Sequence, residues 1–104
     1  MLRKKRNDRN HVIYMISCED TGDFYIGLTV SVGRAFRKSA EVRFMKHRSA
    51  AKMDGKAWAF SEFLRANPAA KYDVHVLDVI RGRKAAHELE RALIAGFEPT
   101  LNTK

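Results

Sequence analysis

The sequence predicts a single α+β domain in which a small antiparallel or mixed sheet packs against helices. Its 104 residues suffice for one domain, and the hydrophobic share of 45% suffices for one compact core. Three short segments are rich in β-branched and aromatic residues, and three others are rich in helix-forming residues. Their order along the chain is β-β-α-α-β-α, which is typical of an α+β fold.

Three segments have the composition of strands. Residues 11–17 (HVIYMIS) and 24–29 (FYIGLT) flank the turn-forming cluster 19–23, so we expect an antiparallel hairpin. Gly27 within the second segment indicates a bulge or a close backbone approach. Residues 72–80 (YDVHVLDVI) alternate with period two and predict the third strand.

Three further segments are rich in good helix formers and are bounded by residues that end helices. The predicted helices are 34–53, ending near Asp54 and Gly55; 58–65, beginning at Trp58 and stopped by Asn67 and Pro68; and 84–95, stopped by Gly96. Residues 99–104 are expected to be a short irregular tail.

Basic residues are concentrated in two parts of the chain. The sequence has 20 Lys and Arg against 12 Asp and Glu, a formal net charge of +8. Residues 1–10 carry five Lys and Arg against one Asp, and residues 33–52 carry seven against one Glu. Such a surplus on a small folded protein indicates an anionic partner, most often nucleic acid. We expect 1–10 to be a basic tail, either a phosphate-binding arm or a solvated extension, and 11–104 to be the domain.

Composition also excludes several classes of protein. Cys18 is the single cysteine, which excludes an internal disulfide framework or cysteine zinc site and favours a reducing, cytoplasmic compartment. The longest apolar run, 12–16, is far shorter than the ~20 residues of a membrane span, so no membrane partner is expected.

Glu90 stands out among the acidic residues because three of its four neighbours one helical turn away are apolar. A carboxylate at the margin of an apolar face needs a partner. That partner is either a nearby Lys or Arg, in a salt bridge, or a cation such as Mg²⁺, which prefers carboxylate oxygens.

Two other pairs of residues can carry chemistry. Arg43 and His47 lie four residues apart on one face of the first predicted helix, where they can hold a phosphate and exchange a proton. A solvent-facing basic helix has the same pattern. Tyr14 and Tyr25 lie on the two hairpin strands, where their hydroxyl groups can meet on one face, although tyrosine is common in strands generally.

Taken together, these patterns resemble the GIY-YIG nuclease family over residues 12–102. Four local matches occur in the family's order: Val12-Ile13-Tyr14, Tyr25-Ile26-Gly27, Arg43 with His47, and Glu90 with Leu93-Ile94, Pro99 and Asn102. There are two departures. Val12 stands where the family has Gly, and the long stretch from Gly27 to Arg43 contains Arg34 and Arg37, either of which could replace Arg43. We prefer Arg43 because it has a histidine one turn away.

The resemblance implies a three-stranded antiparallel sheet flanked by helices and a metal-dependent DNA endonuclease, of phage or mobile-element type. It implies that Glu90 is the metal ligand, with Mg²⁺ as the first expectation and Mn²⁺ as the alternative. Tyr14 would be the general base or would position the attacking water, and His47 would receive or relay the proton.

The remaining roles follow from the same resemblance. Tyr25 would orient the phosphate or the water, Arg43 would hold phosphate oxygens, and Asn102 would brace the site from the C-terminal end. The basic residues expected to contact DNA are Arg3, Lys4, Lys5, Arg6, Arg34, Arg37, Lys38 and Lys46. Cutting both strands with one active site per chain requires a homodimer or two encounters. Specificity is expected to be weak, to depend on DNA structure, or to come from a DNA-recognition partner protein. The alternative is a non-catalytic basic DNA- or RNA-binding protein that keeps the nuclease fold.

Overall fold

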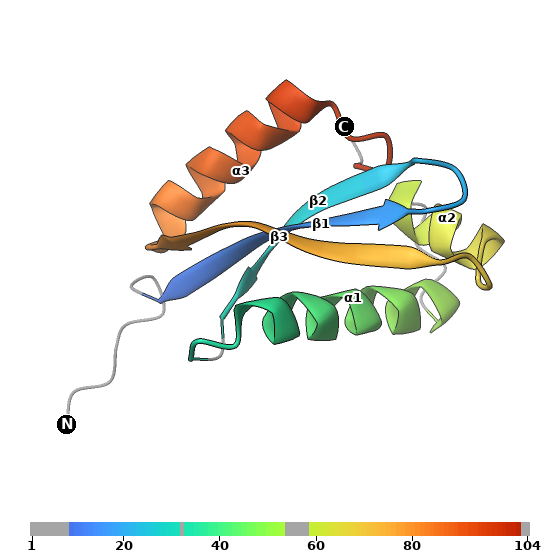
Figure 1. The fold of residues 1–104 in the computed structure, drawn as a ribbon, viewed down its shortest axis with the longest axis horizontal. Helices are drawn as coiled ribbons and strands as arrows, with labels where there is room; N and C mark the ends of the chain where they lie inside the picture. Colours follow the sequence, from blue (N-terminus) through green and yellow to red (C-terminus); the bar gives the residue numbers. More distant parts are fainter. Residues whose placement is uncertain (1–8, 32, 54–58, 103–104) are drawn as a thin grey trace.

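The computed structural model describes residues 9–31, 33–53 and 59–102, which form a three-stranded antiparallel sheet with α3 on one face and α1 on the other (Figure 1). The elements are β1 (Asn10–Cys18), β2 (Phe24–Val30), α1 (Phe36–Met53), α2 (Ala59–Ala66), β3 (Tyr72–Arg81) and α3 (Arg83–Phe97). The predicted α+β class, the element order and the antiparallel hairpin are therefore confirmed.

β1 is the central strand of a sheet with the order β2-β1-β3. Because β1 is covered on both faces, its consecutive residues Val12, Ile13 and Tyr14 are all fully buried. The register places Tyr14 opposite Gly27 of β2, and a bulge interrupts the pairing with β3 between Ile13 and Tyr14. Because the strand order is β2-β1-β3, β2 is an edge strand, and the backbone groups on its outer side do not pair with another strand of the sheet.

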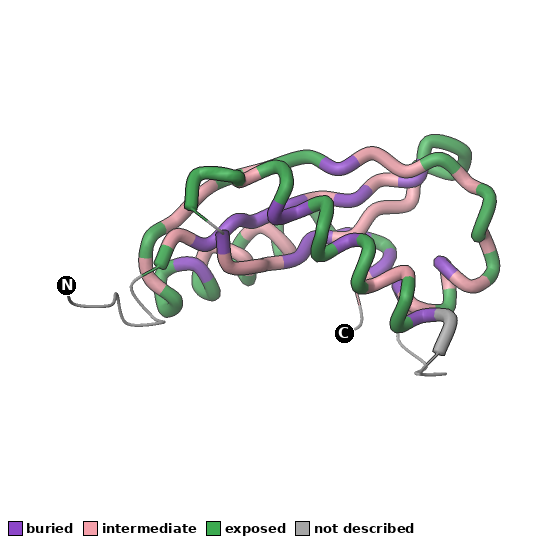
Figure 2. The backbone as a smooth tube through the Cα atoms, turned by 90° about the horizontal axis from the view of Figure 1, so that it is seen from below, coloured by how far each residue is buried: buried purple, intermediate pink, exposed green. Residues whose placement is uncertain are grey.

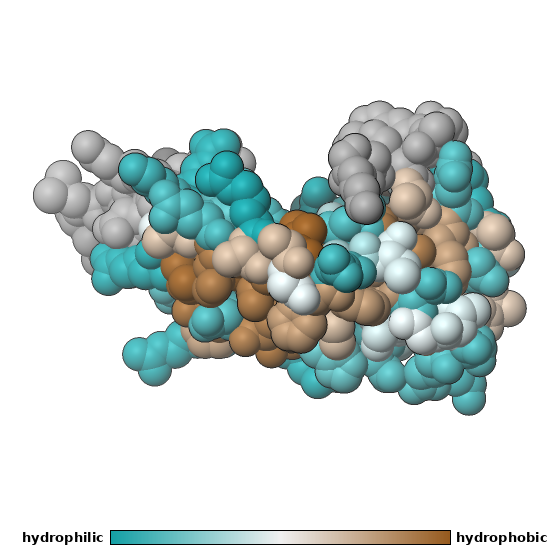
Figure 3. All heavy atoms as spheres, turned by 90° about the horizontal axis from the view of Figure 1, so that it is seen from above, coloured by the Kyte–Doolittle hydropathy of each residue, from teal (hydrophilic) through white to brown (hydrophobic). Residues whose placement is uncertain are grey.

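The main core lies between the sheet and the pair formed by α1 and α2. Among the described ring pairs, the closest stacks Tyr25 on Phe60, with ring centroids 4.3 Å apart. Buried residues follow the middle of the molecule (Figure 2). On the face seen from above, a band of apolar side chains crosses the middle and is surrounded by hydrophilic ones (Figure 3).

The predicted end of the last helix at Gly96 is wrong, because α3 continues to Phe97. The next residue, Glu98, caps the helix. It adopts a left-handed conformation (φ 51°) and donates its backbone N–H to Ile94 O. Pro99 accounts for this end, since proline disfavours the right-handed helical conformation in the residue before it.

Other boundaries differ by one or two residues. α1 begins at Phe36 rather than at 34, and the expected tail 1–10 ends earlier, because Asn10 already pairs with Arg81. Several expectations lie outside the described residues: the basic residues Arg3, Lys4, Lys5 and Arg6, the helix end at Asp54 and Gly55, and the helix start at Trp58. Among the helices that are described, none has the length and hydropathy required to cross a bilayer.

Candidate active site

A cavity of about 410 Å³ opens at the outer edge of β2, between α1 and α3. We call it the cleft. Four of the predicted site residues line it: Tyr14 from β1, Tyr25 from β2, Arg43 from α1 and Glu90 from α3. The fold therefore brings together side chains that are up to 76 residues apart in the sequence. Open cavities with a few convergent polar groups are the usual form of a binding or catalytic site.

Gly27 makes room for the two tyrosines on the cleft side of the hairpin. A Cβ atom at Gly27 would lie 2.5 Å from Tyr14 Oη and 2.7 Å from Tyr25 Cε2, so no other residue fits there without a shift. The atoms that approach Gly27 closely belong to tyrosine side chains rather than to another backbone segment, and the bulge lies in the β1–β3 pairing instead. The tyrosine rings lie on one face with centroids 6.3 Å apart, as the hairpin predicted.

Tyr14 is fully buried, and its hydroxyl oxygen lies 3.1 Å from His47 Nε2. Burial raises the pKa of Tyr14 well above its ordinary value, with the neighbouring Tyr25 adding to the rise and Arg43 opposing it. Burial and the charge of Arg43 lower the pKa of His47 to about 4. At neutral pH the pair is therefore a neutral phenol beside a neutral imidazole, and Tyr14 Oη–H donates to Nε2 when that nitrogen carries no proton.

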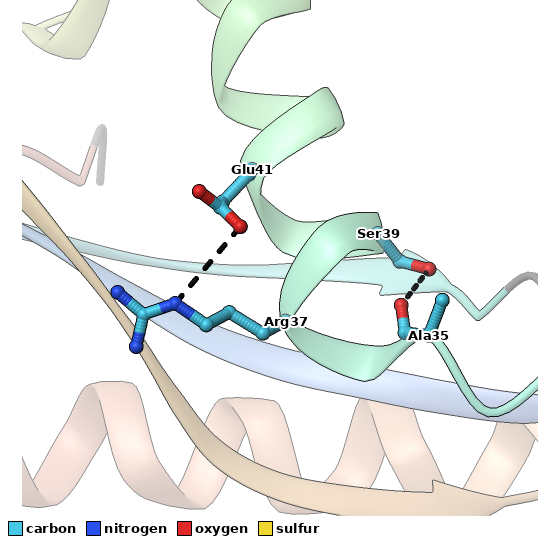
Figure 4. Close-up of polar contacts among 4 residues, drawn as sticks. All are labelled: Ala35, Arg37, Ser39 and Glu41. Atoms are coloured by element: carbon cyan, nitrogen blue, oxygen red, sulfur yellow. Dashed lines mark hydrogen bonds and ion pairs between the residues drawn. The ribbon is translucent and has the colours of Figure 1, made fainter.

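Arg43 is an exposed residue of α1 whose side chain lines the cleft, whereas Arg34 and Arg37 do not line it. Arg37 pairs with Glu41 at 3.9 Å, and this pair lies on the opposite side of α1 from Ser39 (Figure 4). Ser39 Oγ donates to Ala35 O at 2.7 Å near the start of the helix. The guanidinium beside the tyrosines is thus that of Arg43.

Glu90 enters the cleft from α3 and has a side chain that is only 19% exposed. Burial raises its pKa, and the charges of His87 and Arg91 offset part of the rise. Its Oε1 lies 3.8 Å from His87 Nδ1. Among the residues that the structure describes, the partner within ion-pairing distance of Glu90 is therefore a histidine rather than the Lys or Arg considered from the sequence.

The donor set around Glu90 fits a hard divalent cation. Mg²⁺ is usually held by one or two carboxylates and keeps several water molecules or phosphate oxygens as its other ligands. Within the described part of the chain there is no group of three or more His, Cys, Asp or Glu that could hold a metal ion by itself. A single, largely buried carboxylate at an open cleft would supply one ligand to such a cation and leave its other positions to water or phosphate oxygens.

Asn102 binds the outer edge of β2 rather than entering the cleft. Its Oδ1 accepts the N–H of Ile26 at 2.9 Å, and its Nδ2 donates to Ile26 O at 2.8 Å. Leu101 N–H donates to Phe24 O at 3.0 Å, so the segment after α3 pairs with β2 much as another strand would. This segment supports the strand that carries Tyr25 and Gly27.

Three more ionisable residues line the cleft that the sequence analysis did not select: His11, Arg83 and His87. Arg83 and His87 precede Glu90 by seven and three residues, so the three share one face of α3. This spacing is the signal in the sequence that could have identified Arg83 and His87 as neighbours of Glu90. His11 Nδ1 lies 2.8 Å from Arg9 O and donates to it in the tautomer that carries the proton on Nδ1. Nothing in the sequence around His11 indicated a position at the cleft.

Two of the residues expected to bind DNA, Lys38 and Lys46, lie outside the cleft. They line a second cavity of about 300 Å³ between α1 and the end of β2. We call it the side cavity.

Comparison of the chain with protein-family models, with curated proteins and with solved structures finds no match.

Proposed function

We propose that this protein is a metal-dependent endonuclease of the GIY-YIG type that hydrolyses DNA phosphodiester bonds. The observation that carries the proposal is the convergence of Tyr14, Tyr25, Arg43 and Glu90 in one open cleft, with His47 hydrogen-bonded to Tyr14. These are the residues that the motif resemblance selected, and they come from four separate elements.

The charges in the cleft suit a phosphodiester. Arg43 provides a planar set of N–H donors for the non-bridging phosphate oxygens, where negative charge develops in the transition state. Glu90 would hold the divalent ion, Mg²⁺ or alternatively Mn²⁺. When bound, the ion would supply positive charge to the phosphate and to the leaving 3′ oxygen. A carboxylate facing a phosphate would otherwise repel it, so Glu90 has a clear use only with a cation.

Tyr14 and His47 suit the handling of a proton. Because its pKa is raised, Tyr14 stays a neutral phenol at neutral pH and is not available as a phenolate base, so it acts as a hydroxyl that accepts a hydrogen bond from the attacking water and passes a proton onward. His47 Nε2 lies next on that path. The phosphate brings negative charge into the cleft, which raises the pKa of His47 from about 4 and makes it a better proton acceptor. Tyr25 is placed to orient the phosphate or the water.

Nicking of a supercoiled plasmid in the presence of Mg²⁺ tests the proposal. Wild type is expected to nick, and Glu90→Gln to be slower by about 10³-fold, the loss typical of removing a group that stabilises transition-state charge. Glu88→Gln is the matched control, since Glu88 is an exposed carboxylate on the same helix and does not line the cleft. Its rate should stay within about twofold of wild type.

Two results would contradict the proposal. Equal nicking by Glu90→Gln and wild type would remove Glu90 from the mechanism. Absence of nicking by wild type with either Mg²⁺ or Mn²⁺, together with DNA binding, would favour the non-catalytic nucleic-acid-binding alternative. Without metal, Glu90→Gln is expected to bind DNA at least as tightly as wild type, because the substitution removes a negative charge.

A further inference from the structure

The side cavity combines two kinds of lining that a phosphate site alone does not need. Its basic side chains are Lys38, Arg43 and Lys46, and its apolar side chains include Val30, Ala35 and Val42. No Asp or Glu of the described residues lines it. Its volume of about 300 Å³ is at the lower end of the range for small-molecule sites.

The side cavity adjoins the cleft. Both are lined by Thr29 and Val30 at the end of β2 and by Arg43 of α1. Arg43 therefore lies between the two cavities. A nucleic-acid strand whose phosphate contacts Arg43 in the cleft must continue either toward the side cavity or away from it. On the other side of the cleft, Arg83 of α3 provides a further cation.

The lining distinguishes between an unpaired and a paired nucleotide. Lysines at the rim suit the phosphate backbone of any nucleic acid. Valine and alanine side chains give nothing to a phosphate, but they contact the face of a base that has left its stack. In a duplex the bases are stacked and paired, so their faces are not available to such a surface.

We infer that the side cavity is a subsite for one unpaired nucleotide next to the scissile phosphate, with its base against Val42 and its phosphate near Lys38 and Lys46. The substrate of the cleft is then a DNA strand that is single-stranded or locally opened at the cut. This inference rests on the proposed function for the identity of the scissile phosphate, but the subsite itself is a binding property that can be measured without cleavage.

Binding measured by fluorescence anisotropy in EDTA tests the subsite. The probes are a short labelled single strand and the duplex of the same sequence, and wild type should prefer the single strand. Val42→Glu places a carboxylate at the subsite, and Met45→Glu places one on the same helix away from both cavities. Val42 and Met45 are 40% and 66% exposed, so both variants are expected to fold, which circular dichroism checks.

Val42→Glu should weaken single-strand binding about tenfold more than Met45→Glu, while the two variants should bind the duplex alike. The duplex measurement controls for the added negative charge, which is the same in the two variants. An abasic residue moved along the single strand should reduce wild-type affinity about fivefold at one or two positions, the low end of the contribution of one base contact. Val42→Glu should show no such position.

Equal binding of single strand and duplex, an equal loss in the two Glu variants, or a flat abasic profile would each overturn the subsite. Failure of the proposed function gives a different pattern. If the single-strand preference and the effect of Val42→Glu are present but wild type nicks no DNA with Mg²⁺ or Mn²⁺, the subsite stands and the nuclease assignment fails. If wild type nicks DNA and cuts single strand and duplex at equal rates, the subsite fails and the nuclease assignment stands.

Discussion

Tyr14 and Arg43 stand at the same cleft but are held in different ways. Tyr14 is fully buried on the central strand, rests against Gly27 and bonds to His47, so its position is set by several neighbours at once. Arg43 is an exposed residue of α1. Tyr14 belongs to a region that we call the hairpin wall, formed by β1, β2 and Asn102. Arg43 belongs to a region that we call the helical rim, formed by the cleft-facing residues of α1 and α3.

The difference separates the two tasks of the proposed reaction. Holding a hydroxyl in line with an attacking water requires a position fixed by packing, since small displacements reduce the rate steeply. Supplying charge to a phosphate tolerates movement, because electrostatic attraction falls off slowly with distance. Changes in the hairpin wall should therefore reduce both stability and cleavage, whereas changes in the helical rim should reduce cleavage alone.

The largest combined effect on stability and cleavage is expected from Gly27→Ala in the hairpin wall. The added Cβ would meet Tyr14 Oη and Tyr25 Cε2, so the variant should lose about 1–3 kcal/mol of stability, the range for overpacking. Displacement of Tyr14 should also slow cleavage about 100-fold. Thermal unfolding and plasmid nicking measure the two effects.

Gly96→Ala is the matched control for Gly27→Ala. Nothing lies within 4 Å of a Cβ at Gly96, and this residue is inside α3, so alanine should stabilise the protein by up to about 1 kcal/mol. Its cleavage rate should not change. If Gly27→Ala had normal stability and activity, the hairpin wall would not depend on this close approach.

Arg43→Ala in the helical rim should slow cleavage about 100-fold and leave the melting temperature nearly unchanged, because the side chain is exposed. Arg37→Ala is the control on the same helix. Arg37 lies outside the cleft in an exposed pair with Glu41, so its loss should change neither property measurably. A large loss of cleavage in Arg37→Ala or Arg34→Ala, with an active Arg43→Ala, would show that another arginine holds the phosphate.

Asn102→Ala tests the support of the hairpin wall from outside. The substitution removes both side-chain bonds to Ile26 and should cost about 1–2 kcal/mol of stability, at ~1 kcal/mol for each bond. Cleavage should fall about tenfold, because Ile26 lies between Tyr25 and Gly27. Thr100→Ala removes a longer, exposed bond to Phe24 N–H in the same segment and should have a smaller effect on both. Equal effects of the two variants would contradict a specific role for Asn102.

The smallest effect is the pH dependence that His47 adds to stability. Its pKa is lowered from 6.5 to about 4 in the folded protein, so the unfolded chain binds the proton more readily between these values. Stability should therefore fall as the pH drops from about 6.5 to about 4. The contribution is about 1–2 kcal/mol after allowance for solvent screening of the half-buried ring.

Urea unfolding of wild type and His47→Gln across this pH range measures that contribution. The difference in stability between the two proteins should shrink toward pH 4. His75→Gln, an exposed histidine on β3, should follow wild type. A constant difference between wild type and His47→Gln would show that His47 is not held neutral by the hairpin wall.

The sequence by itself determined the elements and their order, because strand alternation, helix composition and turn residues are local signals. It also placed Arg43 and His47 on one helical face, since a spacing of four residues is close to one turn. It misjudged the end of α3. Gly96 was expected to stop the helix, but the helix continues to Phe97 and ends there because Pro99 restricts the conformation of Glu98. Here two local signals competed, and the preference of the residue before proline prevailed.

Only the tertiary structure decided how these elements meet. The sheet order places β2 at an edge, which lets α1, α3 and the segment around Asn102 approach it from different sides. The bond from Tyr14 to His47 spans 33 residues, and the bonds from Asn102 to Ile26 span 76. Such contacts depend on the packing of whole elements, and no local pattern of residues encodes them. The same holds for Arg83 and for the side cavity, which exist as parts of a surface only once α1, α3 and β2 are in place.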